Sequence, residues 1–347
     1  MRVLFDAYWW ESGPISNRMV QMELITAWSR AFPQDQIGLV VPGRPRPLRA
    51  LPPHAEVMFS RSAFLQASTN GLIIPRIAKH WRADVSVVHN FSALRGYSAT
   101  FIHDFMFMDH PRWFTGIENA YFRLMVATSR RASLLLTSSQ TEANRIFRTT
   151  GRQATPIGLG LSSALVESVP TRPRAVATEG QAFVMAVGRL NARKNLAMAI
   201  DGYLASGLHV DTPLVVVGER SGRPEHLTRP ALDAIECGLV RLTGSVSDGE
   251  LRWLYEHARA FLMLSLDEGF GLPLAEARYF GTPAVVSDLP VFHEVLGDYG
   301  TFVNPTDPTD IARGILRVRR GSTRGERHQW EDSVRIMRSE IAERLRS

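Results

Sequence analysis

The 347-residue sequence contains very little cysteine and lysine. Its single cysteine, Cys237, excludes an intramolecular disulfide and a cysteine-based metal site, and it is typical of a reducing compartment. The ten histidines show no H-E-x-x-H or comparable spacing. Arginine supplies 38 of the 40 basic residues, which leaves Lys79 and Lys194 as the two lysines. Each lysine is informative, because lysine is a compact point charge and arginine a planar fork.

The sequence also lacks long apolar runs. None reaches the roughly 18 residues of a membrane span, and the segment MRVLFDAYWW has the pattern of a strand and not of a signal peptide. A hydrophobic content of 45% and a charged content of 21% are typical of a globular chain with a large core. The length predicts two domains of ordinary size. We therefore expect a cytoplasmic protein of two domains.

The net charge of +6 is unevenly distributed along the chain. Residues 1–165 contain 18 Lys and Arg against 10 Asp and Glu, a net +8, whereas residues 166–347 contain 22 against 24, a net −2. A basic first half indicates an anionic partner. An anionic surface at the inner face of the cell membrane or a phosphate-bearing acceptor fits this charge, and a basic surface without a partner is the alternative. Nucleic acid fits poorly, because the sequence has neither a DNA-binding motif nor a basic run interleaved with aromatic residues.

Apolar runs alternate with amphipathic segments, which predicts an α/β fold built from parallel sheets. In the first half we expect strands at residues 2–6, 37–41, 56–59, 85–89, 100–103 and 133–138, and helices at 16–30, 116–131 and 141–149. In the second half we expect strands at 183–187, 214–217, 240–242, 261–266, 283–286 and 301–303, and helices at 195–204, 272–280, 307–320 and 326–346. Ser139 is expected to cap the helix at 141–149, and Ser247 with Glu250 is expected to form a capping box at the start of another helix.

The stretch 150–182 is rich in Gly and Pro and is predicted to be a linker. It places one Rossmann-like domain at residues 1–165, a second at 166–325 and a terminal helix at 326–347. A full G-x-G-x-x-G fingerprint is missing from both domains, which disfavours a dehydrogenase.

Two segments of the first domain carry unusual apolar character. Residues 60–82 combine residues such as Phe64 and Trp81 with basic residues such as Arg61. We expect a loop and then a helix, which either lies on a membrane or faces the core. Residues 105–114, FMFMDHPRWF, are predicted to form an apolar loop that packs on the protein or touches lipid or acceptor.

The stretch 261–288 reads as strand, glycine turn, helix and strand. A helix that starts near Leu272 directs unpaired N–H groups and a positive dipole end at its N-terminus, which favours an anion. Glu268, at the end of the first strand, would repel a phosphate and is expected to bind neutral hydroxyl groups beside it. A sugar joined to a diphosphate fits both features, and an ordinary crossover with solvated acids is the alternative. The turn and helix contribute Gly269, Phe270, Gly271, Leu272 and Glu276.

Other strand ends carry polar or glycine residues that parallel topology brings to the same sheet edge. In the second domain these are Gly188 with Arg189 and Lys194, and Gly218, which together predict a diphosphate site with two cationic clamps. The first domain offers Gly13, His103 and Asp104 at its own strand ends. A structural histidine at a strand end is the alternative for His103.

The pattern resembles the retaining GT-B glycosyltransferases, and most closely glycosyltransferase family 4. Val187-Gly188-Arg189 with Lys194-Asn195-Leu196, and the E-x7-E pattern from Glu268 to Glu276, are its specific parts. His103-Asp104 followed by Pro111 is similar to the H-D-x…P signature of many members. The resemblance covers nearly the whole chain and implies two Rossmann-like domains, with the C-terminal helix crossing back to the first.

The resemblance also implies roles for the site residues. Arg189 and Lys194 stabilise the leaving diphosphate, Glu268 contacts hydroxyl groups of the donor sugar, and His103 lines the sugar pocket. The implied donor-binding residues are Gly13, Asp104, Gly188, Gly218, Gly269, Phe270, Gly271, Leu272 and Glu276, of which Glu276 holds the ribose. The family uses no cofactor and no metal, and the sequence has no D-x-D metal motif.

The H-D-x…P type favours GDP-mannose as donor and therefore mannosyl transfer, with a UDP-sugar as the alternative. The basic first domain and residues 105–114 favour a glycan or a polyprenyl-diphosphate-linked saccharide as acceptor, in cell-surface polysaccharide synthesis. A GT-B epimerase or phosphorylase and a non-catalytic sugar-nucleotide-binding protein are further alternatives. The intact set of charged residues argues against the non-catalytic protein. The stretch Pro156 to Gly160 departs from the family pattern, in which an N-G turn follows the last strand of the first domain.

Overall fold

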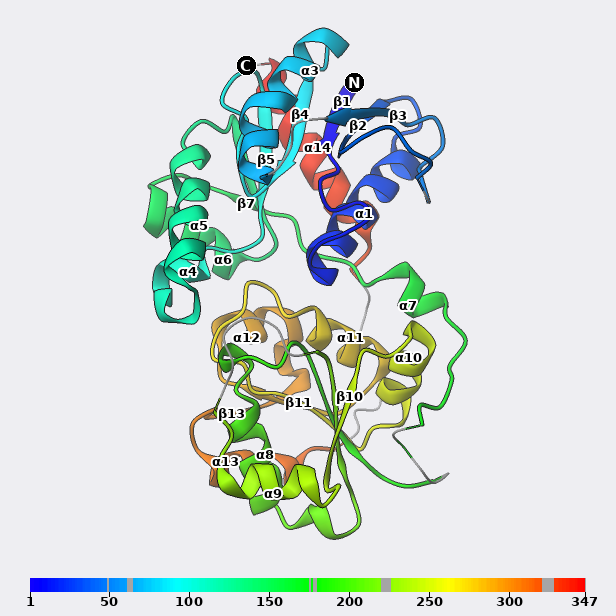
Figure 1. Ribbon diagram of the computed structural model, residues 1–347, viewed down its shortest axis with the longest axis vertical. Helices are drawn as coiled ribbons and strands as arrows, with labels where there is room; N and C mark the ends of the chain where they lie inside the picture. Colours follow the sequence, from blue (N-terminus) through cyan, green and yellow to red (C-terminus); the bar gives the residue numbers. More distant parts are fainter. Residues whose placement is uncertain are drawn as a thin grey trace. The chain divides into compact units, whose positions relative to one another are not determined.

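The computed structural model describes residues 1–48, 50–60, 65–174, 176, 180–219, 226–319 and 328–346. The chain divides into two compact units (Figure 1). The first unit contains Met1–Pro111, Gly116–Gly160 and His328–Ser347, and the second contains Arg112–Thr115 and Leu161–Arg327. The division therefore follows Gly160, whereas the sequence places it near residue 165. The predicted boundary at residues 325 and 326, the start of the last helix at Glu326, and Arg61 and Phe64 lie outside the described residues.

The first unit is built on a seven-stranded, fully parallel sheet in the order β3-β2-β1-β4-β5-β6-β7. The chain runs outward from β1 to one edge and then returns to β4 on the other side of β1. The point between β1 and β4 is therefore a topological switch point, where α/β sheets bind ligands. The strands are β1 (Arg2–Asp6), β2 (Gln36–Pro42), β3 (Glu56–Ser60), β4 (Val85–His89), β5 (Ser98–Ile102), β6 (Leu134–Thr137) and β7 (Thr155–Pro156).

The helices between residues 1 and 160 connect and cover these strands. They are α1 (Ile15–Ala31), α2 (Gln66–Ser68), the π-helical η1 (Thr69–Ile73), α3 (Ile74–Trp81), α4 (Met106–Asp109), the 3₁₀ turn η2 (Pro111–Trp113), α5 (Gly116–Ser129) and α6 (Gln140–Thr150). As predicted, the Ser139 side chain accepts a hydrogen bond from the Glu142 N–H and caps α6.

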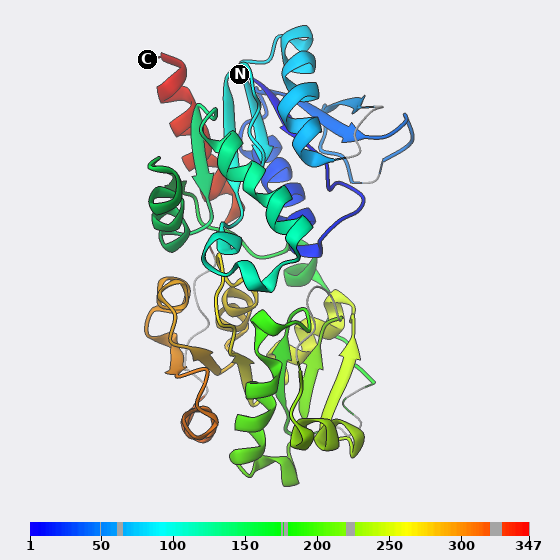
Figure 2. The same ribbon diagram turned by 60° about the vertical axis from the view of Figure 1, so that its left-hand side comes forward.

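The last helix, α14 (Trp330–Arg346), returns to the first unit and lies beside α1 (Figures 1 and 2). Arg338 donates two hydrogen bonds to buried Asp35, from Nε at 2.8 Å and from Nη2 at 3.1 Å. Trp330 fits against Gly160, where an added Cβ would lie 2.7 Å from the indole. The predicted crossing of the C-terminal helix back to the first domain is thereby confirmed.

The second unit repeats the same strand order on a six-stranded parallel sheet, β10-β9-β8-β11-β12-β13. Its switch point lies between β8 and β11. The prediction of two Rossmann-like α/β units is confirmed. The strands are β8 (Val184–Val187), β9 (Leu214–Val217), β10 (Val240–Gly244), β11 (Ala260–Met263), β12 (Ala284–Ser287) and β13 (Gly300–Val303).

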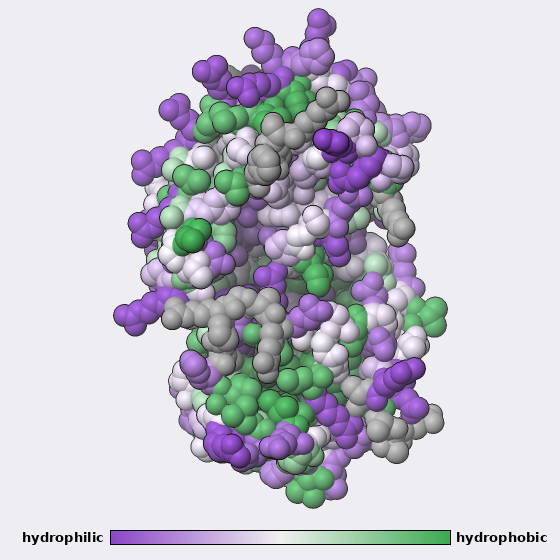
Figure 3. Space-filling model, in the orientation of Figure 1, coloured by the Kyte–Doolittle hydropathy of each residue, from purple (hydrophilic) through white to green (hydrophobic). Residues whose placement is uncertain are grey.

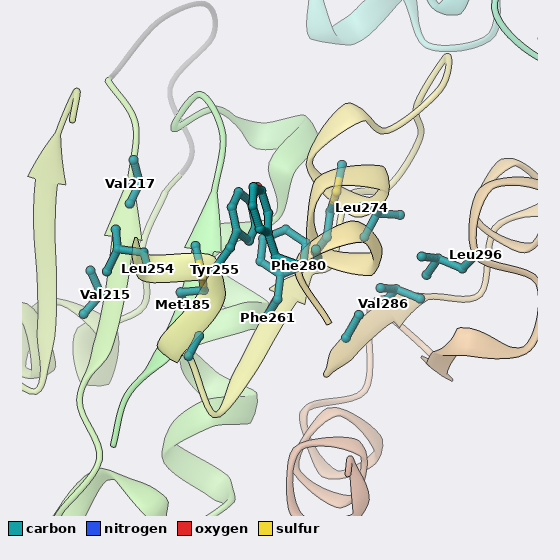
Figure 4. Packing of buried hydrophobic residues seen from close by; sticks show 14 of the residues in the cluster. Met185, Val215, Val217, Leu254, Tyr255, Phe261, Leu274, Phe280, Val286 and Leu296 are labelled. Carbon is teal, nitrogen blue, oxygen red and sulfur yellow. The ribbon is translucent and has the colours of Figure 1, made fainter. Parts of the chain in front are cut away.

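Side chains alternate between the two faces of each strand, and helices cover both faces of this sheet. An apolar cluster therefore forms on each face. Met185 and Phe261 point to one face, where Tyr255 and Phe280 stack with ring centroids 5.7 Å apart (Figure 4). Val184 and the neighbouring strand residues of the opposite face pack with α8 (Leu196–Ala205) and α13 (Pro308–Arg317). The helical elements are α7 (Ser163–Glu167), η3 (Ala192–Lys194), α8 (Leu196–Ala205), η4 (Leu208–Val210), α9 (Arg229–Glu236), α10 (Asp248–His257), α11 (Leu272–Phe280), α12 (Pro290–Leu296), η5 (Gly297–Tyr299) and α13 (Pro308–Arg317).

Several elements differ from the sequence prediction. Residues 105–114 are not a loop: they form α4 and η2, and Phe105, Met106 and Phe107 are buried in the protein. The stretch 150–182 is not linker throughout, because it contains β7 and α7. Helices α9 and α12 were not predicted, and β11 ends at Met263 instead of Leu266.

Candidate functional site

A pocket opens at the switch point of the second unit, where β8 and β11 end side by side. Its lining includes Gly188, Arg189, Lys194, Leu264 and Ser265. The two predicted cations therefore lie at the same edge of the sheet as the segment that leads to Glu268. This is the position at which the strand order of the sheet leaves room for a ligand.

The predicted glycines Gly188 and Gly218 allow two strand ends to approach closely. Their φ angles are +147° and +142°, a region that side chains rarely adopt. A Cβ on Gly218 would lie 1.9 Å from the carbonyl oxygen of Gly188, and one on Gly188 would lie 3.0 Å from Cε of Lys194. Both positions therefore need glycine for the strand ends and the Lys194 side chain to fit.

Lys194 is placed by the short turn η3 and by the residue that follows it. Asn195 is buried with a left-handed φ of +56°. Its Nδ2 donates to the carbonyl oxygens of Leu264, at 3.1 Å, and Pro305, at 2.7 Å. These two bonds tie the turn to the segments that follow β11 and β13, and so fix Lys194 at the pocket.

One carboxylate oxygen of Glu268 forms ion pairs with two basic side chains. Lys194 Nζ lies 2.6 Å from Oε1, and Nη1 of Arg193 lies 2.5 Å from the same atom. Burial alone would raise the pKa of Glu268, but Arg193 and Lys194 outweigh it and lower this pKa to about 2. Desolvation, with the nearby charges of Arg193 and Arg189, lowers the pKa of Lys194 against the opposing effect of Glu268. The carboxylate is therefore charged at neutral pH.

Arg193 is a residue that the sequence prediction missed as a site member. The prediction used Arg189 and Lys194 as the two clamps, whereas Arg193 is the arginine that pairs with Glu268. Its guanidinium also donates to the carbonyl oxygen of Asp267 at 3.2 Å. Arg189 is exposed and lines the pocket. The segment RLNARK, residues 189–194, is visibly basic, but no periodicity in it shows which of its two arginines faces the carboxylate.

The predicted glycine turn and helix follow Glu268 directly. Gly271 has a φ of +95° and precedes α11, and Pro273 occupies the first turn, where a missing N–H costs nothing. Gly269, Phe270 and Leu272 complete this connection. The N-terminus of α11 therefore follows the ion cluster along the chain.

Glu276, in the middle of α11, is buried and accepts a hydrogen bond from the Tyr255 hydroxyl at 2.7 Å. Burial raises the pKa of Glu276, the bond from Tyr255 lowers it and Asp248 raises it, and together they give a pKa of about 7. Glu276 is therefore partly protonated near neutral pH. Its bond to Tyr255 joins α11 to α10.

Ser265 is a second residue that the sequence analysis missed. It is fully buried, lines the pocket, and its hydroxyl oxygen has no hydrogen-bond partner among the described residues. A buried hydroxyl without a partner is uncommon in proteins. Its signal in the sequence is a polar residue at the end of an apolar run.

The first unit has a polar cluster at its own switch point. Asp6 ends β1, His89 ends β4, and His103 follows β5. Buried Asp6 accepts hydrogen bonds from four groups, the N–H groups of Tyr8 and His89 and the side-chain amides of Gln66 and Asn70. Burial raises the pKa of Asp6, and these bonds partly oppose the rise.

His103, Gly13 and Asp104, predicted from the sequence, all lie in the first unit. Burial lowers the pKa of His103 to about 3, so its imidazole is neutral. Gly13 has a φ of +112° and leaves room for the Trp9 indole. Asp104 accepts a hydrogen bond from the Met106 N–H at 3.3 Å, at the start of α4.

The described part of the chain contains neither a metal-binding cluster of acidic, histidine or cysteine residues nor a membrane-spanning helix. No group of three or more His, Cys, Asp or Glu residues is placed to hold a metal ion in the ranges described above. Of the helices that the structure describes, none is both long and apolar enough to cross a membrane.

The fold and the second-unit motifs define a GT-B glycosyltransferase architecture. Residues 170–336, just under half of the chain, match the family model of glycosyl transferases group 1. The match agrees with the resemblance to glycosyltransferases inferred from the sequence of the second unit.

Curated relatives include two O-antigen mannosyltransferases. RfbU of Salmonella typhimurium is 32% identical over 231 residues, 66% of this chain and 63% of the relative. O-antigen chain mannosyltransferase B of Escherichia coli is 28% identical over 221 residues, 58% of each chain. The matches thus span less than two thirds of these two relatives. The GDP-mannose:cellobiosyl-diphosphopolyprenol alpha-mannosyltransferase of Komagataeibacter xylinus is 25% identical over 301 residues, 78% of this chain and 71% of the relative.

Solved structures share the fold at low sequence identity. Sucrose-phosphate synthase from Thermosynechococcus elongatus has a TM-score of 0.67 at 15% identity, covering 99% of this chain and 97% of that one. HepE of Anabaena, in complex with UDP and glucose, has a TM-score of 0.63 at 17% identity and covers both chains fully. These likenesses show the fold.

Proposed function

We propose that the protein transfers mannose from GDP-mannose, with retention of anomeric configuration and without a metal ion, to a glycan or a polyprenyl-diphosphate-linked saccharide. The acceptor would belong to a cell-surface polysaccharide under synthesis. The observation that carries this proposal is the cluster of Arg193, Lys194 and Glu268 beside the pocket that Arg189 lines. Three cations and one carboxylate suit a ligand that joins a diphosphate to a hydroxyl-rich group.

The cations would act on the leaving group. In the transfer, the bond between the anomeric carbon and the diphosphate oxygen breaks, and both electrons of that bond leave with the nucleoside diphosphate. Lys194 and Arg189 would stabilise the negative charge that develops on this oxygen, which is the contribution that preorganised cations make to a transition state. No resident cofactor is needed for this step.

The acceptor would attack from the same face as the leaving group. Its hydroxyl oxygen forms the new bond to the anomeric carbon, and its proton passes to the departing phosphate oxygen. Glu268 would accept hydrogen bonds from hydroxyl groups of the donor sugar, and its low pKa supports this role because an ionised carboxylate is a strong acceptor. Glu276 would bind the nucleotide ribose, and His103 would line the sugar pocket.

The choice of GDP-mannose rests on the relatives, whose names state mannosyl transfer and, in one case, GDP-mannose. A UDP-sugar is the second candidate, favoured by the UDP-bound structure of similar fold. A sugar-nucleotide-binding protein without turnover is a third, and the presence of Lys194, Arg189 and Glu268 together argues against it.

A peripheral position at the inner face of the cell membrane would bring a lipid-linked acceptor to the first unit. Support comes from the net charge of +8 in residues 1–165 and from exposed apolar side chains there, namely Leu65, Leu72, Leu94 and Ile117. On the face drawn in Figure 3, hydrophilic residues are interspersed with groups of hydrophobic residues. Vesicles with and without anionic lipid would test this part by co-sedimentation.

The function is tested in two steps with the full chain. A thermal-shift panel of GDP, UDP and ADP should give its largest stabilisation with GDP, because ligand binding to the folded state raises the melting temperature. Turnover of GDP-mannose with a polyprenyl-linked saccharide should then continue in EDTA and give the α-configured product. A larger shift with UDP would replace the donor, a strict metal requirement would remove the proposed mechanism, and nucleotide binding without turnover on any acceptor would favour the binding protein.

A further inference from the structure

The imidazoles of His89 and His103 lie side by side at the switch point of the first unit. Their ring centroids are 5.6 Å apart and the planes differ by 26°. Nε2 of each ring is shielded from solvent and has no hydrogen-bond partner among the residues that the structure describes. Buried polar atoms are nearly always hydrogen-bonded, so two adjacent exceptions make this cluster a candidate ligand site.

One side chain fixes the proton of His89. The Trp9 backbone N–H donates to Oε1 of Gln21 at 3.0 Å, so the amide group of Gln21 turns its Nε2 toward His89. This Nε2 lies 3.2 Å from Nδ1 of His89. Since an amide nitrogen can only donate, Nδ1 must accept, and the neutral ring carries its proton on Nε2. His89 therefore offers an N–H donor at the atom that has no partner.

The Trp9 indole contacts both imidazoles. Its ring centroid lies 6.1 Å from that of His89 and 5.7 Å from that of His103. A Cβ on Gly13 would lie 2.5 Å from Cδ1 of Trp9, so the glycine makes this position of the indole possible. The bond to Gln21 involves the backbone N–H of Trp9, so a rotation of the Trp9 side chain would leave that bond in place.

We propose that Trp9 is a movable cover, and that its displacement lets Nε2 of His89 and Nε2 of His103 hydrogen-bond a hydroxyl group of a saccharide. A hydroxyl both donates and accepts, so it can accept from His89 and serve either tautomer of His103. An anion fits poorly, because the charged member of the described hydrogen-bond network is the carboxylate of Asp6, and both imidazoles are neutral. The choice of a saccharide rests on the proposed function; the cover and the neutral-donor site do not.

The test uses ¹⁹F NMR of the full chain labelled with 5-fluorotryptophan, with the Trp9 resonance assigned from Trp9→Phe. Titration with methyl α-D-mannopyranoside should shift this resonance and make it more sensitive to a soluble paramagnetic quencher. In His89→Phe, which lacks the donor, the sugar-induced change should disappear. A resonance that does not respond to the sugar in the wild type, or that responds equally in His89→Phe, would overturn the proposal.

A pair of glycine variants tests the cover without any ligand. Gly13→Ala should raise the quencher sensitivity of the Trp9 resonance, because its Cβ displaces the indole. Gly96→Ala is the matched control, since Gly96 also has a positive φ, +79°, but nothing within 4 Å of an added Cβ. Equal sensitivity in the two variants would show that Trp9 is not a cover of the kind proposed.

A third measurement leaves His89 in place and guards against misfolding of the variant. ¹⁵N spectra of imidazole-labelled wild-type protein should show His89 as a neutral ring protonated on Nε2, and this nitrogen should shift when the sugar is added. Protonation on Nδ1, or no shift, would contradict the proposal.

The GDP-induced thermal shift, measured on the same samples, reports on the second unit. Loss of that shift alone would count against the proposed function and not against the Trp9 cover.

Discussion

Lys194 and Glu268 are 74 positions apart in the sequence, and the lysine Nζ lies 2.6 Å from Oε1 of the carboxylate. Both side chains are largely buried, with exposed fractions of 14% and 10%. In this conformation Glu268 neutralises a cation that we assign to the leaving diphosphate. Arg193 contacts the same oxygen, so Glu268 keeps a cationic partner when Lys194 turns to a phosphate.

Lys194→Met should reduce kcat/KM for the donor by about 10²–10³-fold, the loss seen when one preorganised group at a developing charge is removed. The melting temperature should change little, because Arg193 remains on Glu268. The control is Lys79→Met, which removes the other lysine of the chain, an exposed residue of α3. Donor turnover close to the wild type in Lys194→Met would remove this residue from the leaving-group clamp.

Glu268→Gln should separate binding from turnover. The substitution removes one negative charge beside the cations, so GDP should bind at least as tightly as it does to the wild type. Turnover should fall, because the amide is a weaker acceptor for sugar hydroxyls. Isothermal calorimetry and initial rates measure the two effects. Glu236→Gln, an exposed change of the same charge in α9, is the control. Weaker GDP binding in Glu268→Gln would contradict the assigned role.

The sequence allowed prediction of the parts of the site that lie at strand ends. Arg189, Lys194 and Glu268 follow apolar runs, and parallel topology alone places such residues at one sheet edge. Arg193 could not be assigned in this way. It contacts Glu268 because Asn195 adopts a left-handed φ and is tied to Leu264 and Pro305, contacts that no local pattern contains.

The first-unit cluster shows the same limit. Asp6 and His89 stand at strand ends, but their hydrogen-bond partners Gln66 and Asn70 come from the segment between β3 and β4. An amphipathic pattern in residues 60–82 cannot show which polar residue turns inward to a carboxylate. Helices α9 and α12 did carry local signals, because each has a proline in its first turn.

Glu276→Gln should change the pH dependence of stability. The folded-state pKa of Glu276 is about 7, above its ordinary value of 4.5, so the stabilising proton is present at low pH and lost as the pH rises through 7. Above that pH, the burial of the ionised carboxylate costs on the order of 3 kcal/mol. The glutamine variant should therefore unfold at a higher urea concentration than the wild type at pH 8, and at a similar one near pH 4. An equal difference at both values would mean that Glu276 is not the titrating group.

Gly218→Ala should destabilise the second unit and disturb the pocket together. The new Cβ meets the carbonyl oxygen of Gly188 at 1.9 Å, and the φ of +142° is unfavourable for alanine by about 1–3 kcal/mol before any clash is counted. The matched control is Gly207→Ala, where φ is also positive, +72°, but nothing lies within 4 Å of an added Cβ. Urea unfolding should therefore show a larger loss of stability for Gly218→Ala than for Gly207→Ala.

The same clash moves the strand end that carries Gly188 beside Lys194. Gly218→Ala should therefore also weaken GDP binding, whereas Gly207→Ala should leave it unchanged. Equal losses of stability, with GDP binding intact in both variants, would show that close approach of Gly188 and Gly218 is not needed to form the pocket.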